Sequence, residues 1–407
     1  MPAIKVFDDV HWVGANDRVT DLFEGMWPIT REGVSYNSYL IQDEKTALID
    51  LVKETKVDPF LRHIGSVADI RKLDYIIVNH TEPDHTGALP IVRQLAPEAK
   101  IFCTKRAAEM IYNFYGIDDN VHVITDGETL SLGKHSLSFH TAPLLHWPDT
   151  MLTYMASRKT IFTCDAFGGY GALPGYIFDD QCPDLSFYKQ ESLRYFANIV
   201  CRFSPAVRKA IKKVTDAGLE IDMVAPGHGL VWRKDPGEII GLYSKWADYF
   251  EGQTEKRVSL LYGSMYGNTR RYMETVAQGL AEQGVAVDVF DIVRTHSSYI
   301  LPAVLRNQGV VLGVPTYEAG LFPPAAHLMD MIQRKNIRHR DAAVFGSFLW
   351  SGGAQKEFKQ LIDGMSWNLI GTQEFQGGYK EDDIPDAYTL GQQFGQFILA
   401  KDLTSET

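Results

Sequence analysis

The sequence contains few cysteines, and none of them are spaced as metal-binding or redox pairs. Its 407 residues include Cys103, Cys164, Cys182 and Cys201, and no two of these form a C-x-x-C pair. Zinc ribbons, rubredoxin-like iron centres and thioredoxin-like redox motifs are therefore without support. We expect all four cysteines to be small, buried hydrophobic residues.

The sequence also lacks long apolar runs and an excess of positive charge. No segment approaches the roughly 18–20 apolar residues that cross a membrane. The first ten residues carry Lys5, Asp8 and Asp9 where a signal peptide would have an apolar region. A formal net charge of −11 disfavours nucleic acid and anionic membranes as partners. We therefore expect a cytoplasmic protein with no nucleic-acid or membrane partner.

The length and composition favour a globular protein with two domains. Hydrophobic residues make up 45% of the chain and charged residues 22%, which is ordinary for a soluble protein. A polar segment, Glu251–Arg257, separates an apparent helix, Pro236–Phe250, from an apolar strand, Val258–Tyr262. This boundary predicts one domain over residues 1–252 and a second over residues 253–407.

Both domains are expected to be α/β. The first mixes strands with helices such as Val57–Val67, which predicts sheets covered by helices. Its expected strands are Val34–Ile41, Thr46–Asp50, Tyr75–Asn79, Lys100–Cys103, Ser136–Thr141, Met151–Met155, Thr160–Cys164 and Met223–Ala225. The second alternates strands and helices regularly, which is typical of a doubly wound parallel sheet. Its expected strands are Val258–Tyr262, Val285–Asp291, Gly309–Gly313, Ala342–Phe348 and Trp367–Thr372, with helices at Arg270–Gln283 and Gln355–Ser366.

A dense group of potential metal ligands follows the expected strand Tyr75–Asn79. The group lies in a predicted loop, and further candidates follow other strands; together they are His80, Glu82, Asp84, His85, His146, Asp165 and His228. A single His after a strand is most often a surface residue, and Asp165 alone could cap a helix. Three crowded carboxylates, however, would repel one another unless cations lay between them. The set therefore predicts two metal ions, with Asp165 as a bridging ligand.

A second group of candidates surrounds the loop after Val258–Tyr262. This loop, Gly263–Thr269, precedes a helix, so its backbone N–H groups and the helix dipole favour an anion such as phosphate. It lacks the Lys of a P-loop, and a plain strand-to-helix turn is the alternative. Two later loops, Gly313–Glu318 and Gly346–Gly353, follow neighbouring strands and should stand beside it. The three loops together favour a bound cofactor.

These motifs resemble those of the flavodiiron protein family over the whole chain. The His80-x-Glu82-x-Asp84-His85 run resembles the metallo-β-lactamase fold, with Glu82 where its zinc hydrolases have His. The resemblance implies an N-terminal αββα sandwich and a C-terminal flavodoxin-like doubly wound sheet. It implies that His80, Glu82 and His146 hold one iron, that Asp84, His85 and His228 hold the other, and that Asp165 bridges them. A mixed imidazole and carboxylate set suits iron and oxygen chemistry. In some family members the residue corresponding to His85 is not a ligand.

The resemblance also implies an FMN site and an activity. The FMN site would comprise Ser264, Met265, Tyr266, Gly267, Asn268, Thr269, Pro315, Thr316, Tyr317, Glu318, Ser347, Phe348, Trp350, Ser351, Gly352 and Gly353. A donor would reduce FMN, and FMN would pass electrons singly to the irons, which reduce dioxygen to water and/or nitric oxide to nitrous oxide. The sequence does not choose between the gases. Because no C-x-x-C pair is present, the donor is expected to be separate, such as rubredoxin or a reduced deazaflavin coenzyme.

The resemblance further implies a head-to-tail homodimer, and leaves a dimer of dimers open. The linker enters the second domain at the amino end of its first strand, roughly 17 Å from the carboxyl end where the flavin would bind. A partner's metal site would therefore receive the electrons. Two alternatives remain: a metal-dependent hydrolase of the metallo-β-lactamase fold with an accessory flavodoxin-like domain, and a non-catalytic electron carrier. Glu82 argues against the first and the full ligand set against the second.

Overall fold

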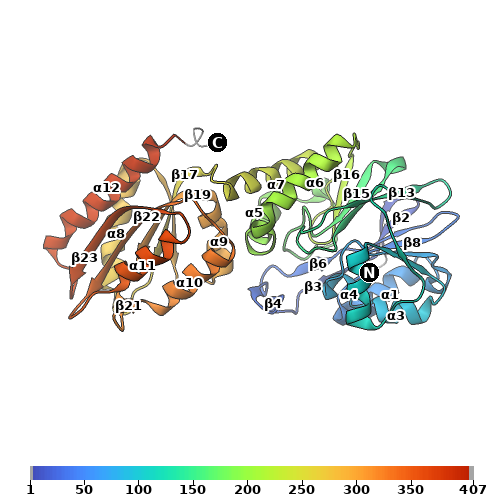
Figure 1. Cartoon of the computed structure of the whole chain (residues 1–407), viewed down its shortest axis with the longest axis horizontal. Coiled ribbons are helices and arrows are strands. Elements are labelled where there is room, and N and C mark those ends of the chain that lie inside the picture. Colours follow the sequence, from blue (N-terminus) through green and yellow to red (C-terminus); the bar gives the residue numbers. More distant parts are fainter. Residues whose placement is uncertain (1–2, 403–407) are drawn as a thin grey trace. The chain divides into compact units, whose positions relative to one another are not determined.

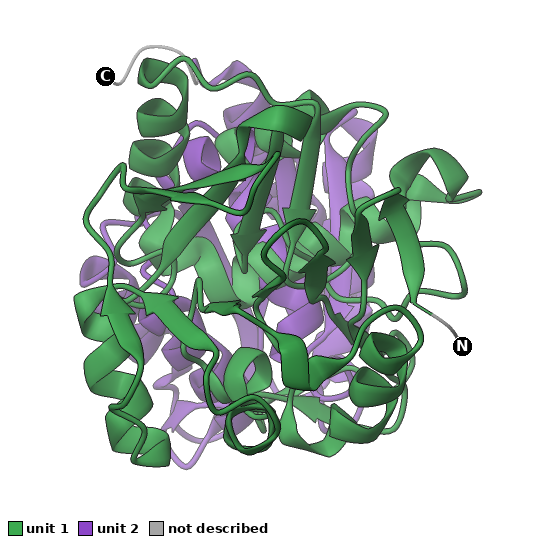
Figure 2. Cartoon of the chain, turned by 90° about the vertical axis from the view of Figure 1, so that its right-hand side faces the viewer, with its two compact units in different colours: residues 1–244 green, residues 245–407 purple. Residues whose placement is uncertain are grey.

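The computed structural model describes residues 3–402 and divides the chain into two compact units. Unit 1 is Met1–Ser244 and unit 2 is Lys245–Thr407; Figure 2 colours them separately. Both units mix helices and strands, which confirms the expected α/β class (Figure 1). Within residues 3–402, no helix combines the length and apolarity that a membrane span requires.

Unit 1 is built on two sheets. The larger has the order β1-β2-β7-β8-β9-β10-β11, with parallel pairing from β8 to β11, and the smaller has the order β12-β13-β14-β15-β16. The strands of the larger sheet are β1 Ile4–Phe7, β2 Val10–Trp12, β7 Tyr39–Ile41, β8 Ala47–Ile49, β9 Tyr75–Ile77, β10 Lys100–Cys103 and β11 Val121–Val123. Those of the smaller are β12 Thr129–Ser131, β13 Ser136–Thr141, β14 Met151–Met155, β15 Thr160–Cys164 and β16 Met223–Pro226.

Helices cover the outer faces of both sheets and complete the αββα sandwich. Figure 1 shows α1, α3 and α4 beside the larger sheet, and α6 and α7 beside the smaller. Phe60 and Ile64, one turn apart on α1, are buried while Arg62 is exposed, so one stripe of the helix packs on the sheet. The helices are α1 Val57–Gly65, α2 Pro83–Thr86, α3 Leu89–Leu95, α4 Lys105–Tyr115, α5 Leu185–Tyr195, α6 Ser204–Asp216 and α7 Pro236–Phe250, of which the last part, from Lys245, belongs to unit 2.

The expected single strand Val34–Ile41 is wrong, because the chain changes sheets at Asn37. β6 (Val34–Tyr36) pairs with β3 (Ala15–Asp17) in a small separate sheet, and β7 begins only at Tyr39. The buried Asn37 donates through Nδ2 to the carbonyl oxygens of Pro226 (2.9 Å) and Gly229 (3.0 Å). The Asn37 side chain thus ties this point of the chain to the loop after β16.

Unit 2 has a five-stranded parallel sheet in the order β18-β17-β19-β22-β23, which is the flavodoxin-like order. Its strands are β17 Glu255–Tyr262, β18 Ala286–Asp291, β19 Asn307–Gly313, β22 Asp341–Phe348 and β23 Asn368–Gln376. Its helices are α8 Asn268–Glu282, α9 Ser297–Arg306, α10 Pro323–Arg334, α11 Ala354–Asp363 and α12 Ile384–Ala400. Figure 1 shows α8 and α12 on one face and α9, α10 and α11 on the other, so the sheet is doubly wound as expected.

Glycines let α8 and α12 approach closely over the unit 2 core. A Cβ at Gly391 of α12 would lie 2.2 Å from the Val276 carbonyl oxygen of α8, so only glycine fits there. The core beneath the two helices includes Val276 and Leu280 of α8 and Phe394 of α12, all buried. This packing holds the N-terminus of α8 in place beside the sheet.

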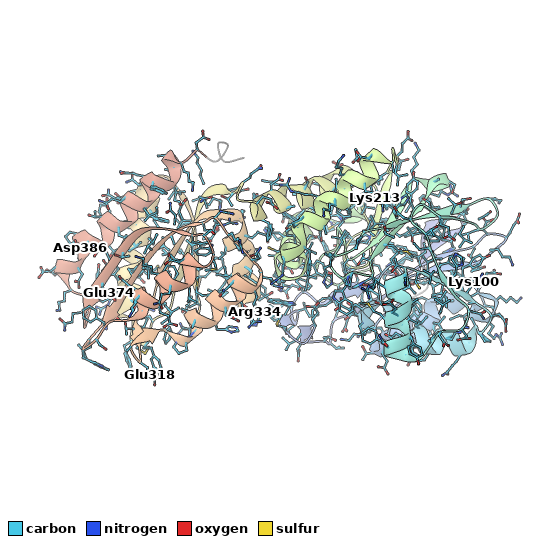
Figure 3. The ribbon with its side chains drawn as sticks, in the orientation of Figure 1. Lys100, Lys213, Glu318, Arg334, Glu374 and Asp386 are labelled. Atoms are coloured by element: carbon cyan, nitrogen blue, oxygen red, sulfur yellow. The ribbon has the colours of Figure 1, made fainter. Side chains whose placement is uncertain are left out.

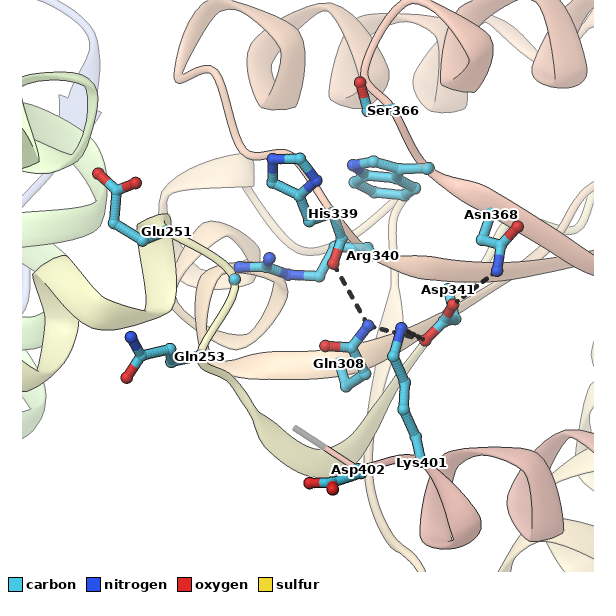
Figure 4. A pocket seen from close by; sticks show the side chains of 12 residues that line it. Glu251, Gln253, Gln308, His339, Arg340, Asp341, Ser366, Asn368, Lys401 and Asp402 are labelled. Carbon is cyan, nitrogen blue, oxygen red and sulfur yellow. Dashed lines mark hydrogen bonds and ion pairs between the residues drawn. The ribbon is translucent and has the colours of Figure 1, made fainter. Parts of the chain in front are cut away.

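The amino ends of the unit 2 strands surround a polar hollow of about 480 Å³ (Figure 4). At its centre the buried carboxylate of Asp341 accepts from Gln308 Nε2 (2.7 Å), Lys401 Nζ (2.9 Å) and Asn368 Nδ2 (3.2 Å). Because Lys401 follows α12, this network joins the end of the last helix to the starts of β19, β22 and β23. Its polar groups satisfy one another, which indicates a structural role.

The cysteines are mostly buried, as expected. Cys103, Cys164 and Cys201 are buried and unpaired as disulfides. Cys182 is only half-buried, and its Sγ lies 3.7 Å from the Tyr176 hydroxyl, so the expectation of full burial is wrong at this position.

Candidate metal and flavin sites

The candidate metal ligands of unit 1 lie at the ends of strands. His80 follows β9, Asp165 follows β15 directly and His228 follows β16. The expected loop after His80 is wrong in part, because Pro83 to Thr86 form the helical turn α2. Proline is tolerated at a first helical position, where its missing N–H removes no hydrogen bond. This helical backbone holds Asp84 and His85, and Leu51 N donates to the His85 carbonyl oxygen at 2.9 Å.

The structure brings all seven predicted ligand side chains together in two adjoining groups. One group contains His80, Glu82, His146 and Asp165, and the other contains Asp84, His85 and His228; the ligand atoms within each lie within 4.8 Å of one another. Asp165 faces both groups. Its Oδ2 lies 3.3 Å from the Nε2 atoms of His80 and His146, while its Oδ1 lies 2.9 Å from His85 Nε2 and 3.2 Å from His228 Nε2.

These spacings fit metal ions. The Oε2 atom of Glu82 lies 3.2 Å from the Nε2 atoms of both His80 and His146, and Asp84 Oδ2 lies 3.3 Å from His228 Nε2. Two ligand atoms that each lie about 2.1 Å from one metal ion, at a right angle, are about 3 Å apart. Among residues 3–402, the buried oxygens of Asp84, the Oδ2 of Asp165 and the Nε2 of His228 find no hydrogen-bond partner. Buried charges are normally paired or bind metals, so this set suits cations.

The electrostatics of the cluster are strongly coupled. Burial alone would lower the pKa of His146, but the Asp165 and Glu82 carboxylates outweigh it and raise the pKa to about 9. Burial likewise opposes protonation of His228, yet Asp165 and Asp84 raise its pKa to about 10. The pKa of Glu82 is lowered, because His146 and His80 outweigh its burial. The cluster therefore holds protons on its imidazoles that a metal ion would have to displace.

Two residues beside the cluster, Tyr195 and Asp149, were not among the predicted site residues. The buried hydroxyl of Tyr195 donates to Asp165 Oδ1 at 2.9 Å, and the carboxylate of Asp149 faces His80 Nδ1. Tyr195 lies at the end of α5, next to a π-helical turn, Phe196–Val200; such turns often occur at functional sites. Asp149 lies three residues after His146 in the same loop, and this proximity was the one available clue.

Unit 2 contains a hollow of about 730 Å³ at the carboxyl ends of its strands. Its lining includes most of the residues that the three loops were expected to supply: Met265, Tyr266, Asn268, Pro315, Thr316, Tyr317, Glu318, Ser347, Phe348, Trp350 and Ser351. Figure 3 labels Glu318 at this end of the unit. Four residues that were not expected also line it: Ala319, Leu349, Gly377 and Gly378. Ser264, Gly267, Thr269, Gly352 and Gly353 are not among the lining residues.

The first loop ends at the N-terminus of α8. Ser264 Oγ accepts from the backbone N–H of Gly267 at 3.0 Å, and Gly267 has a φ of 88°, which glycine adopts without strain. Helix α8 then begins at Asn268, so its first N–H groups are available to an anion. Thr269 is buried, which explains its absence from the hollow.

The other two loops pack backbone to backbone. A Cβ at Gly346 would lie 1.8 Å from the Val314 carbonyl oxygen, and a Cβ at Gly353 would lie 2.0 Å from that of Ala319. The side chains of Tyr266 and Trp350 stand out from the hollow, 89% and 88% exposed, while Tyr317 is 41% exposed. Planar apolar surface at the rim of a hollow next to an anion site suits a flavin nucleotide.

Comparison with known proteins agrees with both sites. Residues 34–229 match the family described as ODP family beta lactamase, and residues 260–390 match flavodoxin. The chain is 35% identical over 398 residues to the nitric oxide reductase of Moorella thermoacetica, covering 97% of this chain and 98% of that protein. The class is therefore a metallo-β-lactamase-like domain joined to a flavodoxin domain.

Solved structures narrow this class to one family. The rubredoxin oxygen:oxidoreductase of Desulfovibrio gigas superposes with a TM-score of 0.93 at 30% identity, covering 99% of this chain and 100% of that chain. The flavodiiron protein of Giardia intestinalis gives 0.92 at 29% identity, covering 98% and 97%. The chain belongs to the flavodiiron protein family.

Proposed function

We propose that this chain is an oxidoreductase that binds two irons in unit 1 and FMN in unit 2, and reduces nitric oxide and/or dioxygen. The observation that carries this function is the arrangement around Asp165, whose two oxygens each face a separate group of imidazoles and carboxylates. Relatives of this chain are named for reactions of both gases. A hydrolase is disfavoured because the first group contains the carboxylate of Glu82.

The proposed ligand set divides as the two groups do. His80, Glu82 and His146 would hold one iron, Asp84, His85 and His228 would hold the other, and Asp165, which faces both groups, would contribute to both. The three carboxylates balance most of the charge of two divalent ions. This pairing of charges lowers the cost of burying the carboxylates and the ions together. The Tyr195 hydroxyl holds a proton at its oxygen atom, 2.9 Å from Asp165 Oδ1. When bound, ferrous iron supplies electrons and open positions for a diatomic gas, and FMN supplies electrons singly.

We assign FMN to the hollow of unit 2. Its phosphate would lie at the N-terminus of α8, contacted by the loop from Ser264 to Thr269. Its ring would lie between the loops that carry Tyr317 and Trp350, where Gly352 and Gly353 permit close backbone approach. Because Gly377 and Gly378 also line the hollow, we add them to the proposed contacts.

The remaining expectations stay proposals. We propose that a separate donor, such as rubredoxin or a reduced deazaflavin coenzyme, reduces the FMN, and that the protein works in the cytoplasm. We also retain the domain boundary between residues 252 and 253. Within unit 2 the linker meets the amino end of β17, an eight-residue strand, and the hollow lies at its other end, about 25 Å away.

This separation supports a head-to-tail homodimer in which each flavin serves the partner's irons. Exposed apolar side chains lie beside both sites: Tyr266 and Trp350 at the hollow of unit 2, and in unit 1 Leu144, two residues before His146, and Met26, three residues after Phe23, whose ring packs on His228. Covering such side chains would exclude water from both sites.

Metal and flavin analysis of two variants tests the site assignments. Asp165→Ala should remove most iron and leave FMN bound, while a double replacement of Asn268 and Thr269 by Ala should weaken FMN binding and leave about two irons. Wild-type protein that contains zinc in place of iron, from iron-replete cells, would contradict the proposed function.

Mixing the same two variants tests the homodimer. After subunit exchange, a mixed dimer has one intact flavin and one intact iron site on different chains. If electrons pass from the flavin of one subunit to the irons of its partner, activity should return. If electrons pass only within each chain, the mixed dimer should have no activity. A protein that is monomeric by light scattering and fully active would also refute the dimer.

A further inference from the structure

Asp149 is a buried carboxylate aimed at a candidate ligand from outside the metal cluster. It lies in the loop between β13 and β14 and is fully buried. Its Oδ1 and Oδ2 each lie 3.2 Å from His80 Nδ1. Its Oδ2 also accepts from the backbone N–H and the hydroxyl of Thr81, both at 2.7 Å. Thr104 Oγ1 donates to the Asp149 carbonyl oxygen at 2.8 Å and fixes the loop from the side of α4.

These contacts decide which nitrogen of His80 carries a proton. An ionised carboxylate can only accept, so the proton of a neutral His80 ring lies on Nδ1. Its Nε2 is then left as a lone pair that faces Glu82 and Asp165, at 3.2 and 3.3 Å. Only that tautomer can bind a metal on the cluster side.

Within the described part of the chain, residues 3–402, no carboxylate lies within hydrogen-bond distance of the Nδ1 atom of His85 or His228 in the other group of candidate ligands. His228 Nδ1 lies 2.7 Å from the carbonyl oxygen of Ser35, a neutral group. His85 Nδ1 is buried and, within residues 3–402, has no hydrogen-bond partner. A carboxylate behind an imidazole makes it a stronger donor to a metal than a carbonyl does, because negative charge raises its basicity.

We propose that Asp149 is a positioning residue that fixes His80 as its Nδ1–H tautomer, so that the metal position of His80, Glu82 and His146 binds more tightly than the position of Asp84, His85 and His228. The inference rests on the ligand set proposed above. It adds to that set a residue that touches no metal and an order of affinity between two positions.

The alternative is that Asp149 merely locks the loop through Thr81. The two roles predict opposite orders for two substitutions. In Asp149→Asn the amide oxygen must face the Thr81 N–H, which can only donate, so the amide NH₂ faces His80 Nδ1. That NH₂ competes with the amide oxygen, which also lies 3.2 Å from Nδ1, and so favours the His80 proton on Nε2, where it blocks metal binding. Asp149→Ala leaves both tautomers accessible and so disturbs metal binding less, although it disturbs the loop more.

The experiment is a Co(II) titration of the metal-free, FMN-loaded chain, followed through the visible bands of the metal. Wild type should take up two ions per chain in steps of unequal affinity. Asp149→Asn should weaken the tighter step by about 10- to 100-fold, the usual effect of removing such a partner, and more than Asp149→Ala does. Asp126→Asn is the matched control. It removes the same charge from a carboxylate that contacts Lys213 and Thr141, and it should leave both steps unchanged.

The outcomes separate the possibilities. Two unchanged steps in Asp149→Asn, or a larger loss in Asp149→Ala that parallels its thermal destabilisation, would overturn the positioning role. A wild type that binds no Co(II) would instead refute the proposed ligand set. If neither variant folds, NMR of ¹⁵N-histidine-labelled, Zn(II)-loaded wild type decides: the Nδ1 proton of His80, which faces a carboxylate, must be shifted further downfield than that of His228, which faces a carbonyl, and equal shifts overturn the proposal.

Discussion

Raising the pH of the metal-free protein from 7 to 9 is expected to tighten its binding of divalent metal. The pKa of His146 is raised to about 9 and that of His228 to about 10, because the neighbouring carboxylates outweigh burial. A metal ion must displace these protons, and each unit of pKa above the working pH costs about 1.4 kcal/mol. At pH 7 the penalty is therefore about 3 kcal/mol at His146 and about 4 kcal/mol at His228. Affinity should rise at least about tenfold per pH unit at each position up to pH 9, because the pKa values of His80 and His85 are raised as well.

Titration calorimetry in two buffers of different ionisation enthalpy measures this effect, because protons released by the protein add buffer heat. At pH 7 we expect at least one proton released per metal bound. The stability of the metal-free protein should change in the opposite direction. The raised pKa values stabilise it fully below about pH 6.5, and this contribution is lost as the pH rises through 9 and 10. A metal affinity that stays flat from pH 7 to 9, with no proton release, would refute the electrostatic account of the cluster.

Two further substitutions probe unit 2. Asp341→Ala removes the acceptor of Lys401 and of two amide groups, so we expect the free energy of unfolding to fall by about 2–4 kcal/mol. The flavin fluorescence should then be released at a lower urea concentration. An unchanged urea midpoint would show that the network is dispensable. Gly346→Ala places a methyl group 1.8 Å from the Val314 carbonyl oxygen and should cost about 1–3 kcal/mol and weaken FMN binding. The control is Gly241→Ala in α7, where the added methyl group meets nothing within 4 Å and should stabilise the protein by about 1 kcal/mol. Equal effects of the two glycine changes would contradict the close approach of the loops.

The positions of the candidate ligands could be predicted because each of them depends on local sequence. His80, Asp165 and His228 each follow a short apolar strand closely, which places these side chains at the end of a sheet without reference to distant parts of the chain. The helical turn α2 was missed although Pro83 is a recognised signal for the first turn of a helix.

The partners of these ligands could not be predicted, because they come from distant parts of the chain. Tyr195 meets Asp165 across 30 residues, and Asp149 meets His80 across 69. The break in the expected strand Val34–Ile41 depends on Asn37, whose partner Pro226 is 189 residues away. None of these pairings leaves a periodic pattern in the sequence.

Two residues that line the hollow of unit 2, Gly377 and Gly378, were not predicted, because the end of β23 was placed too early. β23 was expected to end at Thr372 but continues to Gln376, so the loop that follows it was placed too early. Gly377 and Gly378 therefore reach the hollow without having been expected there. Strand ends are set by pairing with the neighbouring strand, here β22, and not by the residues of the strand alone.

The most direct test of the central claim is the electron count when fully reduced protein meets one gas. Reduced FMN and two ferrous irons together hold four electrons, enough to reduce one dioxygen to water. Anaerobically reduced wild type mixed with one equivalent of dioxygen per chain should therefore reoxidise both centres and release no hydrogen peroxide. Asp165→Ala, which keeps only the flavin, should reoxidise more slowly and release hydrogen peroxide. Where nitric oxide is the substrate, wild type should form nitrous oxide and the variant should not. Hydrogen peroxide from wild type together with no nitrous oxide, or an Asp165→Ala variant that behaves as wild type does, would contradict the account.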